Sequence, residues 1–168
     1  LFKLLHKWIY RGPFLPILPS APMRVAVIAD THDRYPHNLI EMLTPADEIW
    51  HLGDVCDPSV LIDFEQLRRP IRVVSGNNDL NEAWPPHLDL RRNGIRFHLE
   101  HVPPGRPPCD CDVIVHGHTH VPRDEILGGV RWLSPGCISR PNRGWGPSFG
   151  WLHFREQPRT FSWEIVSL

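Results

Sequence analysis

Four strand-like runs in this chain each end in side chains that can bind a metal ion. Residues 25–29 precede Asp30-Thr31-His32, residues 49–52 precede Gly53-Asp54, residues 71–74 precede Gly76-Asn77-Asn78-Asp79, and residues 113–115 precede His116-Gly117-His118-Thr119-His120. Open α/β sheets place ligand-binding loops beyond the carboxyl ends of their strands, where several loops meet. The pattern therefore predicts an α/β protein in which these four loops form one site.

The residue types in these loops favour transition metals. Carboxylates, amide oxygens and imidazoles suit manganese, iron, zinc, nickel or cobalt, whereas calcium prefers oxygen ligands alone. A lone histidine at a strand end is more often a packed or hydrogen-bonded residue, but here three imidazoles follow one strand. Two ions about 3.5–4 Å apart are held together by a shared ligand, and a carboxylate can serve both.

The order and spacing of these motifs resemble the calcineurin-like metallophosphoesterases, in particular their small single-domain phosphodiesterase branch. The resemblance runs from Met23 to about the C-terminus, and Ser134-Pro135-Gly136 stands where the family usually has Asn-Pro-Gly. It implies an α/β fold, a four-layer α/β/β/α sandwich with two mixed β-sheets. It also implies two metals: the first bound by Asp30, His32 and His120, the second by Asn77, His118 and an intermediate histidine, with Asp54 bridging them.

The intermediate histidine departs from the family pattern, because no His-Gly pair precedes His116-Gly117. His98 and His101 are the candidates. Read with the period of a strand, residues 95–101 place His101 on the apolar face and at the strand's end, so we favour His101. The proline-rich residues 102–108 replace the helix that usually covers this region, since prolines at this density exclude a helix.

A second departure concerns proton transfer. Many relatives have a histidine at the position of Asn78, where it can contact the phosphate and protonate the leaving group. An amide can donate a hydrogen bond to a phosphate oxygen but cannot deliver a proton at neutral pH. The small phosphodiesterase branch often lacks this histidine too. We expect Asn78 to contact substrate and Asp79 to orient a ligand or a turn amide, and Arg140 and Arg143 are candidate phosphate contacts.

Several other polar residues have simpler interpretations. His51 is expected to be a packed strand residue, and His116 is expected to be structural. His37 follows the first motif and lies either at a substrate entrance or on a solvated loop. The four cysteines form neither a C-x-x-C pair nor a secreted framework, which indicates thiols in a reducing compartment.

The remaining pattern indicates one domain over residues 23–168. Helices are predicted at 37–43 and 59–67, with Pro58 suited to a helix start. Beyond Gly76 the chain becomes β-rich. Asn93-Gly94 and Gly128-Gly129 predict hairpin turns, and residues 150–154 and 160–166 predict a final strand pair.

Residues 1–22 differ in kind from the rest. Apolar residues recur there at helical spacing, both lysines of the chain lie there, and prolines then recur every third residue. We expect an amphipathic segment and an extended linker, which could contact a membrane surface or a partner or fold back on the domain. The chain has no apolar stretch long enough to span a bilayer and no signal-peptide pattern, so we expect a cytoplasmic protein, with an oligomer as an open alternative.

These features together predict dinuclear, metal-dependent hydrolysis of phosphoesters, with diesters favoured over monoesters and a metal-bridging hydroxide as nucleophile. Manganese is the expected metal, with iron, zinc, nickel, cobalt or magnesium as alternatives. The expected substrate is a small phosphoester, because a formal net charge of −1 does not favour general nucleic-acid binding. The alternative is a non-catalytic metal-binding scaffold similar to the retromer subunit. That lineage is altered at the motifs that this chain retains as Gly53-Asp54 and Gly76-Asn77.

Overall fold

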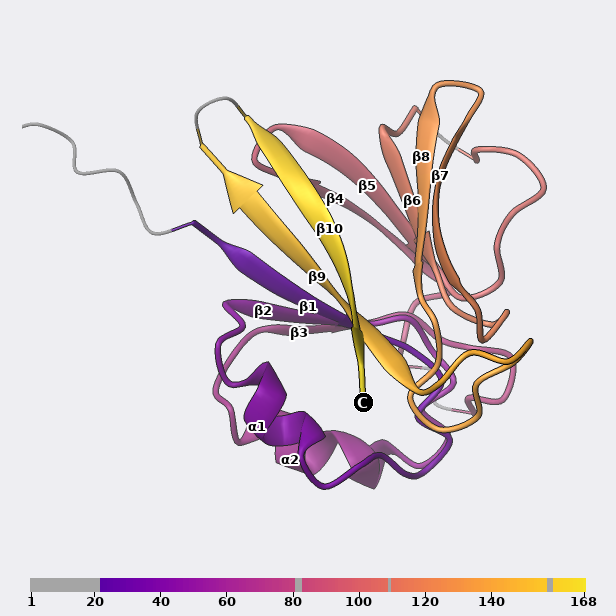
Figure 1. Ribbon diagram of the computed structural model, residues 1–168. Coiled ribbons are helices and arrows are strands. Elements are labelled where there is room, and N and C mark those ends of the chain that lie inside the picture. Colours follow the sequence, from indigo (N-terminus) through magenta and orange to yellow (C-terminus); the bar gives the residue numbers. More distant parts are fainter. Residues whose placement is uncertain (1–21, 81–82, 109, 157–158) are drawn as a thin grey trace, which may run out of the picture.

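The computed structural model describes residues 22–80, 83–108, 110–156 and 159–168, which form two five-stranded mixed sheets (Figure 1). The first sheet has the order β10-β9-β1-β2-β3, from β1 (Arg24–Ile28), β2 (Glu48–His51), β3 (Ile71–Val73), β9 (Ser148–Arg155) and β10 (Thr160–Ser167). The second has the order β4-β5-β6-β8-β7, from β4 (His87–Arg92), β5 (Ile95–Glu100), β6 (Val113–His116), β7 (Pro122–Leu127) and β8 (Val130–Pro135). The predicted pair of mixed sheets is confirmed.

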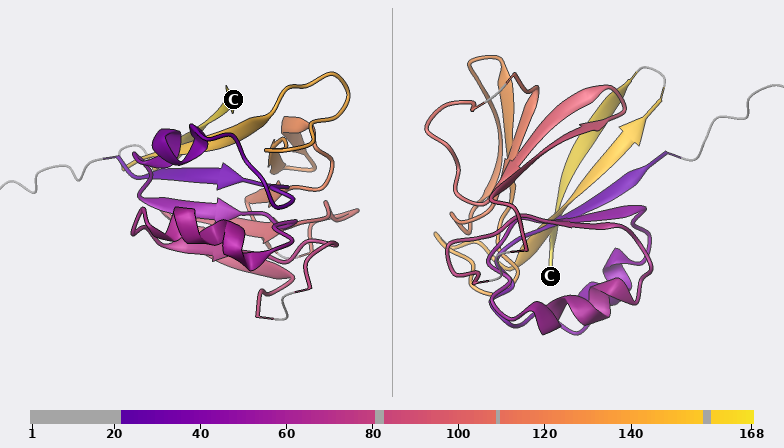
Figure 2. Two further views of the ribbon diagram at one scale, coloured as in Figure 1. Left: turned by 90° about the horizontal axis from the view of Figure 1, so that it is seen from below. Right: turned by 180° about the vertical axis from the view of Figure 1, so that it is seen from behind.

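Short helices cover the outer face of the first sheet (Figure 2, left). They are α1 (Leu39–Leu43), the 3₁₀ helix η1 (Pro58–Leu61) and α2 (Ile62–Glu65). The side chain of Asp57 caps η1 by accepting a 2.8 Å hydrogen bond from the backbone N–H of Ser59. Both predicted helices are therefore present, although each is shorter than its sequence pattern suggested.

Strand β1 shows how the core is divided. Val25 and Val27 face the second sheet and pack in one apolar cluster with residues such as Phe97. Ala26 and Ile28 point the other way, into a cluster beneath the helices. Because alternate side chains of a strand face opposite sides, a strand buried on both faces is a near-continuous apolar run. This explains why residues 25–29 are apolar without a break.

The parallel strands of both sheets end at one edge of the molecule. Strands β1, β2 and β3 are parallel to one another, as are β5, β6 and β8. Backbone hydrogen bonds tie the following loops together, from Asp30 N to Gly53 O (3.0 Å) and from Gly117 N to His101 O (3.1 Å). The loops after β1, β2, β3, β5 and β6 are thus brought to a common edge, as the strand endings predicted.

The hairpins and the proline-rich connection also match their sequence signals. Asn93 and Gly94 join β4 to β5, and Gly128 and Gly129 join β7 to β8, all at positive φ as type I′ turns require. The final pair, β9 with β10, is present. Between β5 and β6, the described residues of the connection contain no helix.

The prediction for residues 1–22 falls outside the described part of the chain, apart from Pro22. In the described part, no helix has both the length and the apolar character needed to cross a membrane.

Candidate metal centre

Five of the predicted ligands, in the loops at the shared edge, have left-handed backbone conformations. They are Asp30 (φ 58°), His32 (φ 43°), Asp54 (φ 49°), His118 (φ 65°) and His120 (φ 56°). Non-glycine residues adopt such angles at an energetic cost, and they cluster at functional sites. The unusual backbone of these loops therefore coincides with the predicted ligands.

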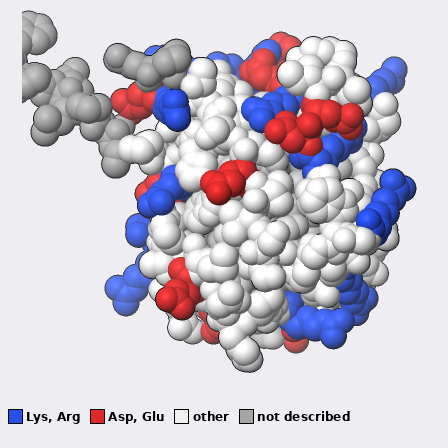
Figure 3. All heavy atoms as spheres, viewed as in Figure 1, with Lys and Arg blue, Asp and Glu red and all other residues white. Residues whose placement is uncertain are grey.

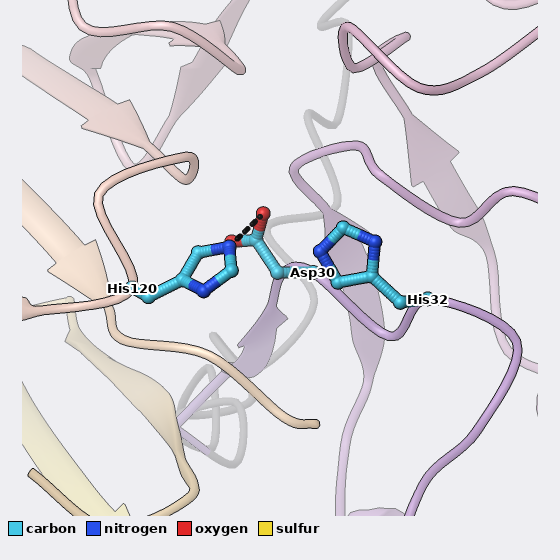
Figure 4. Close-up of side chains that lie close together, drawn as sticks. All are labelled: Asp30, His32 and His120. Atoms are coloured by element: carbon cyan, nitrogen blue, oxygen red, sulfur yellow. Dashed lines mark ion pairs between the residues drawn. The ribbon is translucent and has the colours of Figure 1, made fainter. Parts of the chain in front are cut away.

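Asp30, His32 and His120 form the first ligand group (Figure 4). Their ligand atoms lie within 4.8 Å of one another, and the Asp30 carboxylate lies between the two imidazole rings. Nε2 of His120 is 3.3 Å from Oδ1 of Asp30. Nδ1 of His120 donates a hydrogen bond to the backbone carbonyl of Arg140. This bond leaves Nε2 as the ligand atom facing Asp30.

Asn77, His101 and His118 form the second group. Nδ1 of His101 donates to the carbonyl of Leu52 at 2.7 Å, so Nε2 of the neutral ring carries a lone pair. That atom is 3.0 Å from Oδ1 of Asn77, which also only accepts. Nδ1 of His118 lies 2.9 Å from the same oxygen. The lone pairs of His101 Nε2 and Asn77 Oδ1 therefore point at the same space, and a cation placed between them would remove their repulsion.

Asp54 lies between the two groups. Its Oδ2 is 3.8 Å from Nε2 of His32, and its Oδ1 is 3.5 Å from Nε2 of His101. Burial raises the pKa of the Asp54 carboxyl, but two hydrogen bonds, from the backbone and the side chain of Asn78, help to outweigh burial, and the pKa is held well below its usual range. The side chain is therefore an anion placed to serve both ligand groups.

Two buried ligand atoms show that the cluster fits metal ions. Oδ1 of Asp30 and Nε2 of His32 have no hydrogen-bond partner among the described residues. Asp30 is fully buried and His32 is 7% exposed. Buried polar atoms without partners are costly, and most are satisfied in folded proteins. A divalent cation that takes nitrogen and oxygen ligands would satisfy both atoms.

Glycines let the loops approach closely enough to form this site. A Cβ atom on Gly76 would lie 2.1 Å from Oδ1 of Asp54. A Cβ atom on Gly53, whose φ is 89°, would lie 2.6 Å from the backbone nitrogen of Gly76. The Gly-Asp and Gly-Asn pairs of the sequence therefore have a steric basis as well as a chemical one.

Asn78 and Asp79 contact the loops around the ligands. Asn78 donates to Asp54 twice, from its backbone nitrogen to Oδ1 (2.9 Å) and from Nδ2 to Oδ2 (2.7 Å). The carboxylate of Asp79 accepts from the backbone nitrogens of Cys56 (2.7 Å) and Gly76 (2.8 Å). Asp79 thus joins the second and third loops, and the contact of Asn78 with substrate stays a prediction.

Three histidines, His51, His98 and His116, lie on strands outside the two ligand groups. Both ring nitrogens of His98 contact carboxylates, those of Asp89 and Glu100. The ring of His51 is fully buried, and burial lowers its pKa to about 3, so it is neutral. Burial likewise lowers the pKa of His116 to about 4. His101 alone of the two intermediate candidates reaches the ligand cluster.

Two contacts of this centre were not foreseen from sequence. Sγ of Cys56 lies 3.6 Å from Nδ1 of His32. Ser139 donates a 2.9 Å hydrogen bond to the backbone carbonyl of Asp30. Cys56 follows Asp54 by two residues in the sequence, and this proximity could have indicated that Cys56 lies near the ligands. Ser139 comes from a loop 109 residues along the chain from Asp30 and carried no such signal.

Comparisons with known proteins place this geometry in a family. The model of the calcineurin-like phosphoesterase superfamily domain matches residues 23–157. The chain belongs to this superfamily. It is 29% identical over 138 residues to a probable metallophosphoesterase of Methanothermobacter thermautotrophicus, covering 71% of this chain and 79% of that protein. It is 25% identical over 142 residues to a phosphodiesterase of Methanocaldococcus jannaschii, covering 68% and 83%.

The fold of this superfamily member is also found among solved structures. The crystal structure of a Vps29 single mutant from Entamoeba histolytica matches with a TM-score of 0.71. The match covers 87% of this chain and 99% of that chain at 21% sequence identity. This likeness establishes the architecture and leaves the activity to be argued from the site.

Proposed function

We propose that this calcineurin-like phosphoesterase is a metal-dependent hydrolase that binds two divalent ions and cleaves phosphodiesters. The observation that carries the proposal is the position of Asp54, an anion with one oxygen toward His32 and the other toward His101. A shared carboxylate of this kind is what two neighbouring ions require. Manganese is the metal we propose first, since the donor set mixes imidazole with carboxylate and amide oxygens.

The protein's own groups would hold and orient these reactants. Asp30, His32 and His120 would bind one ion, and Asn77, His101 and His118 the other. Such ions supply charge stabilisation for phosphoryl oxygens and a lowered pKa for water. Asn78 would keep the Asp54 carboxylate oriented through its two hydrogen bonds.

The charge around the centre supports a small anionic substrate. Burial lowers the pKa of His32, and the positive charge of the Arg140 guanidinium lowers it further. The anions Asp54 and Asp30 raise this pKa, but the net change is a decrease. On the face in Figure 3, the Arg side chains of the described residues are scattered, some beside Asp and Glu, rather than forming a continuous basic surface. We propose that attraction of substrate is local to the centre, which fits a small phosphoester better than a long nucleic acid.

Diesters are proposed over monoesters because a phosphodiesterase is among the similar proteins. A cytoplasmic location is proposed because Cys56 and Cys137 are free thiols, as in reducing compartments.

The deciding experiment is metal analysis of the purified protein combined with hydrolysis of bis(p-nitrophenyl) phosphate and p-nitrophenyl phosphate. We expect two Mn²⁺ per chain and faster hydrolysis of the diester. Asp54→Asn should lower kcat/KM by at least about 100-fold, because loss of a shared anionic ligand costs several kcal/mol of charge stabilisation. Asp124→Asn, on the surface of β7, is the matched control. Wild-type turnover and two bound metals in Asp54→Asn would overturn the proposal.

The same assay addresses the scaffold alternative. The likeness to Vps29 supports weighing this alternative, because a shared fold does not by itself determine an activity. A protein that binds two metals yet hydrolyses neither ester with any of the candidate metals would favour a metal-binding scaffold. The retained Gly53-Asp54 and Gly76-Asn77 motifs weigh against that outcome.

A further inference from the structure

A cleft of about 490 Å³ opens directly beside the metal centre, on the outer side of the second sheet. His118 lines this cleft, and its imidazole also contacts Asn77 in the centre. From there the cleft extends along β7 to Arg123 and Glu125, and the loop carrying Arg143 lines it as well. A substrate whose phosphorus lies at the metal centre would therefore have its next chemical group at the mouth of this cleft.

Arg123 is held in place on the wall of the cleft. Its guanidinium stacks over the ring of Trp132, 4.7 Å from the ring centroid. Nη1 donates to Nε2 of His116 at 3.2 Å, and Nε donates to the carboxylate of Glu125. His116 is buried, and its Nδ1 donates to the carbonyl of Gly117 at 3.1 Å, so Nε2 is free to accept this bond. Fixing the side chain in advance reduces the entropy lost when a ligand binds.

The charges of the cleft favour an anion. Arg123 and Glu125 offset each other, and Arg143 adds a positive charge from an exposed turn. Among the described residues, Nη2 of Arg123 and the guanidinium of Arg143 have no hydrogen-bond partner. Guanidinium groups match the oxygens of a phosphate in a bidentate fashion, so two of them in one cleft suit a phosphoryl group.

We propose that this cleft binds a second phosphate of the substrate, beyond the phosphorus that is attacked, with Arg123 and Arg143 as specificity-determining residues. The proposal rests on the proposed function and deepens it. It assigns the preferred substrate to phosphodiesters that carry a further phosphate group, such as phosphorylated nucleotide esters, and makes simple diesters poorer substrates.

A pair of substrates isolates the effect of the second phosphate. They are thymidine 5′-(p-nitrophenyl phosphate) and the same ester phosphorylated at its 3′-oxygen, both followed by release of p-nitrophenolate. We expect the 3′-phosphate to raise kcat/KM by about 10- to 100-fold, the range for one or two charged hydrogen bonds. Arg143→Gln should remove most of this advantage, measured as the ratio of kcat/KM for the two esters, which a general loss of activity would leave unchanged.

Glu125→Gln provides a test of opposite sign. It removes a negative charge from the cleft, so the advantage of the 3′-phosphate should increase. Arg123→Gln should reduce the advantage, with its melting temperature measured because Arg123 also packs on Trp132. Arg131→Gln is the control, since Arg131 pairs with Asp124 outside the cleft.

The outcomes separate this proposal from the proposed function. Equal kcat/KM for the two esters in the wild-type protein, or an unchanged ratio in both Arg143→Gln and Glu125→Gln, would overturn the cleft while leaving the phosphodiesterase intact. If neither ester is hydrolysed, the proposed function fails, and a binding measurement then tests whether the cleft binds a phosphate. Thymidine 3′,5′-bisphosphate should then bind more tightly than thymidine 5′-monophosphate, with the difference reduced by Arg143→Gln. Equal affinities would overturn the proposal.

Discussion

The orientation of one imidazole decides which histidine can complete the second ligand group. His101 uses Nδ1 to bind the carbonyl of Leu52 and turns Nε2 toward Asn77. His98, three residues earlier, has both ring nitrogens on carboxylates of the second sheet. The two-residue period of a strand was sufficient to distinguish them, because Phe97 and Leu99 on the face of His101 are core residues.

We predict that His101→Ala weakens metal binding and that His98→Ala does not. His101→Ala should weaken binding of one of two Mn²⁺ ions by at least about 100-fold, since even outer partners of metal ligands contribute 10- to 100-fold. His98→Ala should retain both ions. Calorimetric titration with Mn²⁺ measures the stoichiometry, and the reverse pattern would exclude His101 as a ligand.

The orientation of Asn78 could not be predicted from the sequence. The side-chain amide of Asn78 donates a hydrogen bond to the carboxylate of Asp54. An asparagine in a turn has no periodic pattern that indicates its direction, and its bond partner comes from a loop 24 residues away in the chain. The residue type still sets a chemical limit, because an amide cannot act as an acid at neutral pH.

We therefore predict a strong dependence of rate on the leaving group. Across a series of aryl and alkyl methyl phosphates, kcat/KM should fall steeply as the leaving-group pKa rises. Asn78→His should flatten this dependence and improve poor leaving groups by up to roughly 100-fold, the lower end of general acid catalysis. Asn78→Ala, which removes the amide without adding an acid, is the control. A wild-type rate that is independent of leaving-group pKa, with chemistry rate-limiting, would mean that another residue donates the proton.

At the scale of elements, most strands and turns could be predicted from local sequence patterns. One salt bridge between the two sheets could not. The apolar runs, the Asn-Gly and Gly-Gly turns and the proline-rich connection each determine their own segment. The buried carboxylate of Glu48 in β2 instead forms salt bridges with residues distant in the chain, Arg72 in β3 and Arg92 in β4. Arg92 is 44 residues away in the chain, so no local pattern could pair these side chains.

We predict that Glu48→Gln destabilises the protein in a pH-dependent way. Burial raises the pKa of Glu48, but hydrogen bonds from Arg92 and Arg72 outweigh it and the net pKa is lowered. A lowered folded-state pKa gives stability that is present above the unfolded-state pKa and lost as pH falls. The free energy of unfolding should drop by about 1–3 kcal/mol at pH 7, discounted for the partial exposure of Arg72.

Urea denaturation of the wild-type protein and Glu48→Gln between pH 7 and pH 3 measures this effect. The difference between the two proteins should shrink as pH falls below about 4.3, the ordinary pKa of a glutamate, because the unfolded state then binds a proton before the folded state does. Glu164→Gln, which removes an exposed pair with His153, should change stability by less than about 0.5 kcal/mol. A difference that stays constant with pH would show that the charge of Glu48 contributes nothing.

At the scale of the whole molecule, the metal centre joins loops from both sheets. Asp30 and Asp54 follow strands of the first sheet, while His101 and His120 follow strands of the second. The superfamily resemblance anticipated this convergence, whereas the sequence motifs alone indicated only that strand ends would meet. The cleft beside the centre was not predictable, because its walls come from β7 and from the loop of Arg143, which only the assembled sheets bring together.

We predict that metal binding stabilises the entire fold. An ion that binds only the folded state adds about 2.7 kcal/mol at a concentration 100 times its dissociation constant. For a domain of this size, each kcal/mol shifts the melting temperature by about 2–4 °C, so saturating Mn²⁺ should raise it by roughly 5–10 °C over protein in EDTA. Asp54→Asn should show a smaller rise and Asp124→Asn the full one. Ca²⁺ at equal concentration should stabilise less, since imidazole ligands suit it poorly. A melting temperature unaffected by Mn²⁺ would mean that the buried Asp30 and His32 atoms do not bind a cation, and that the two sheets are held together at this edge without one.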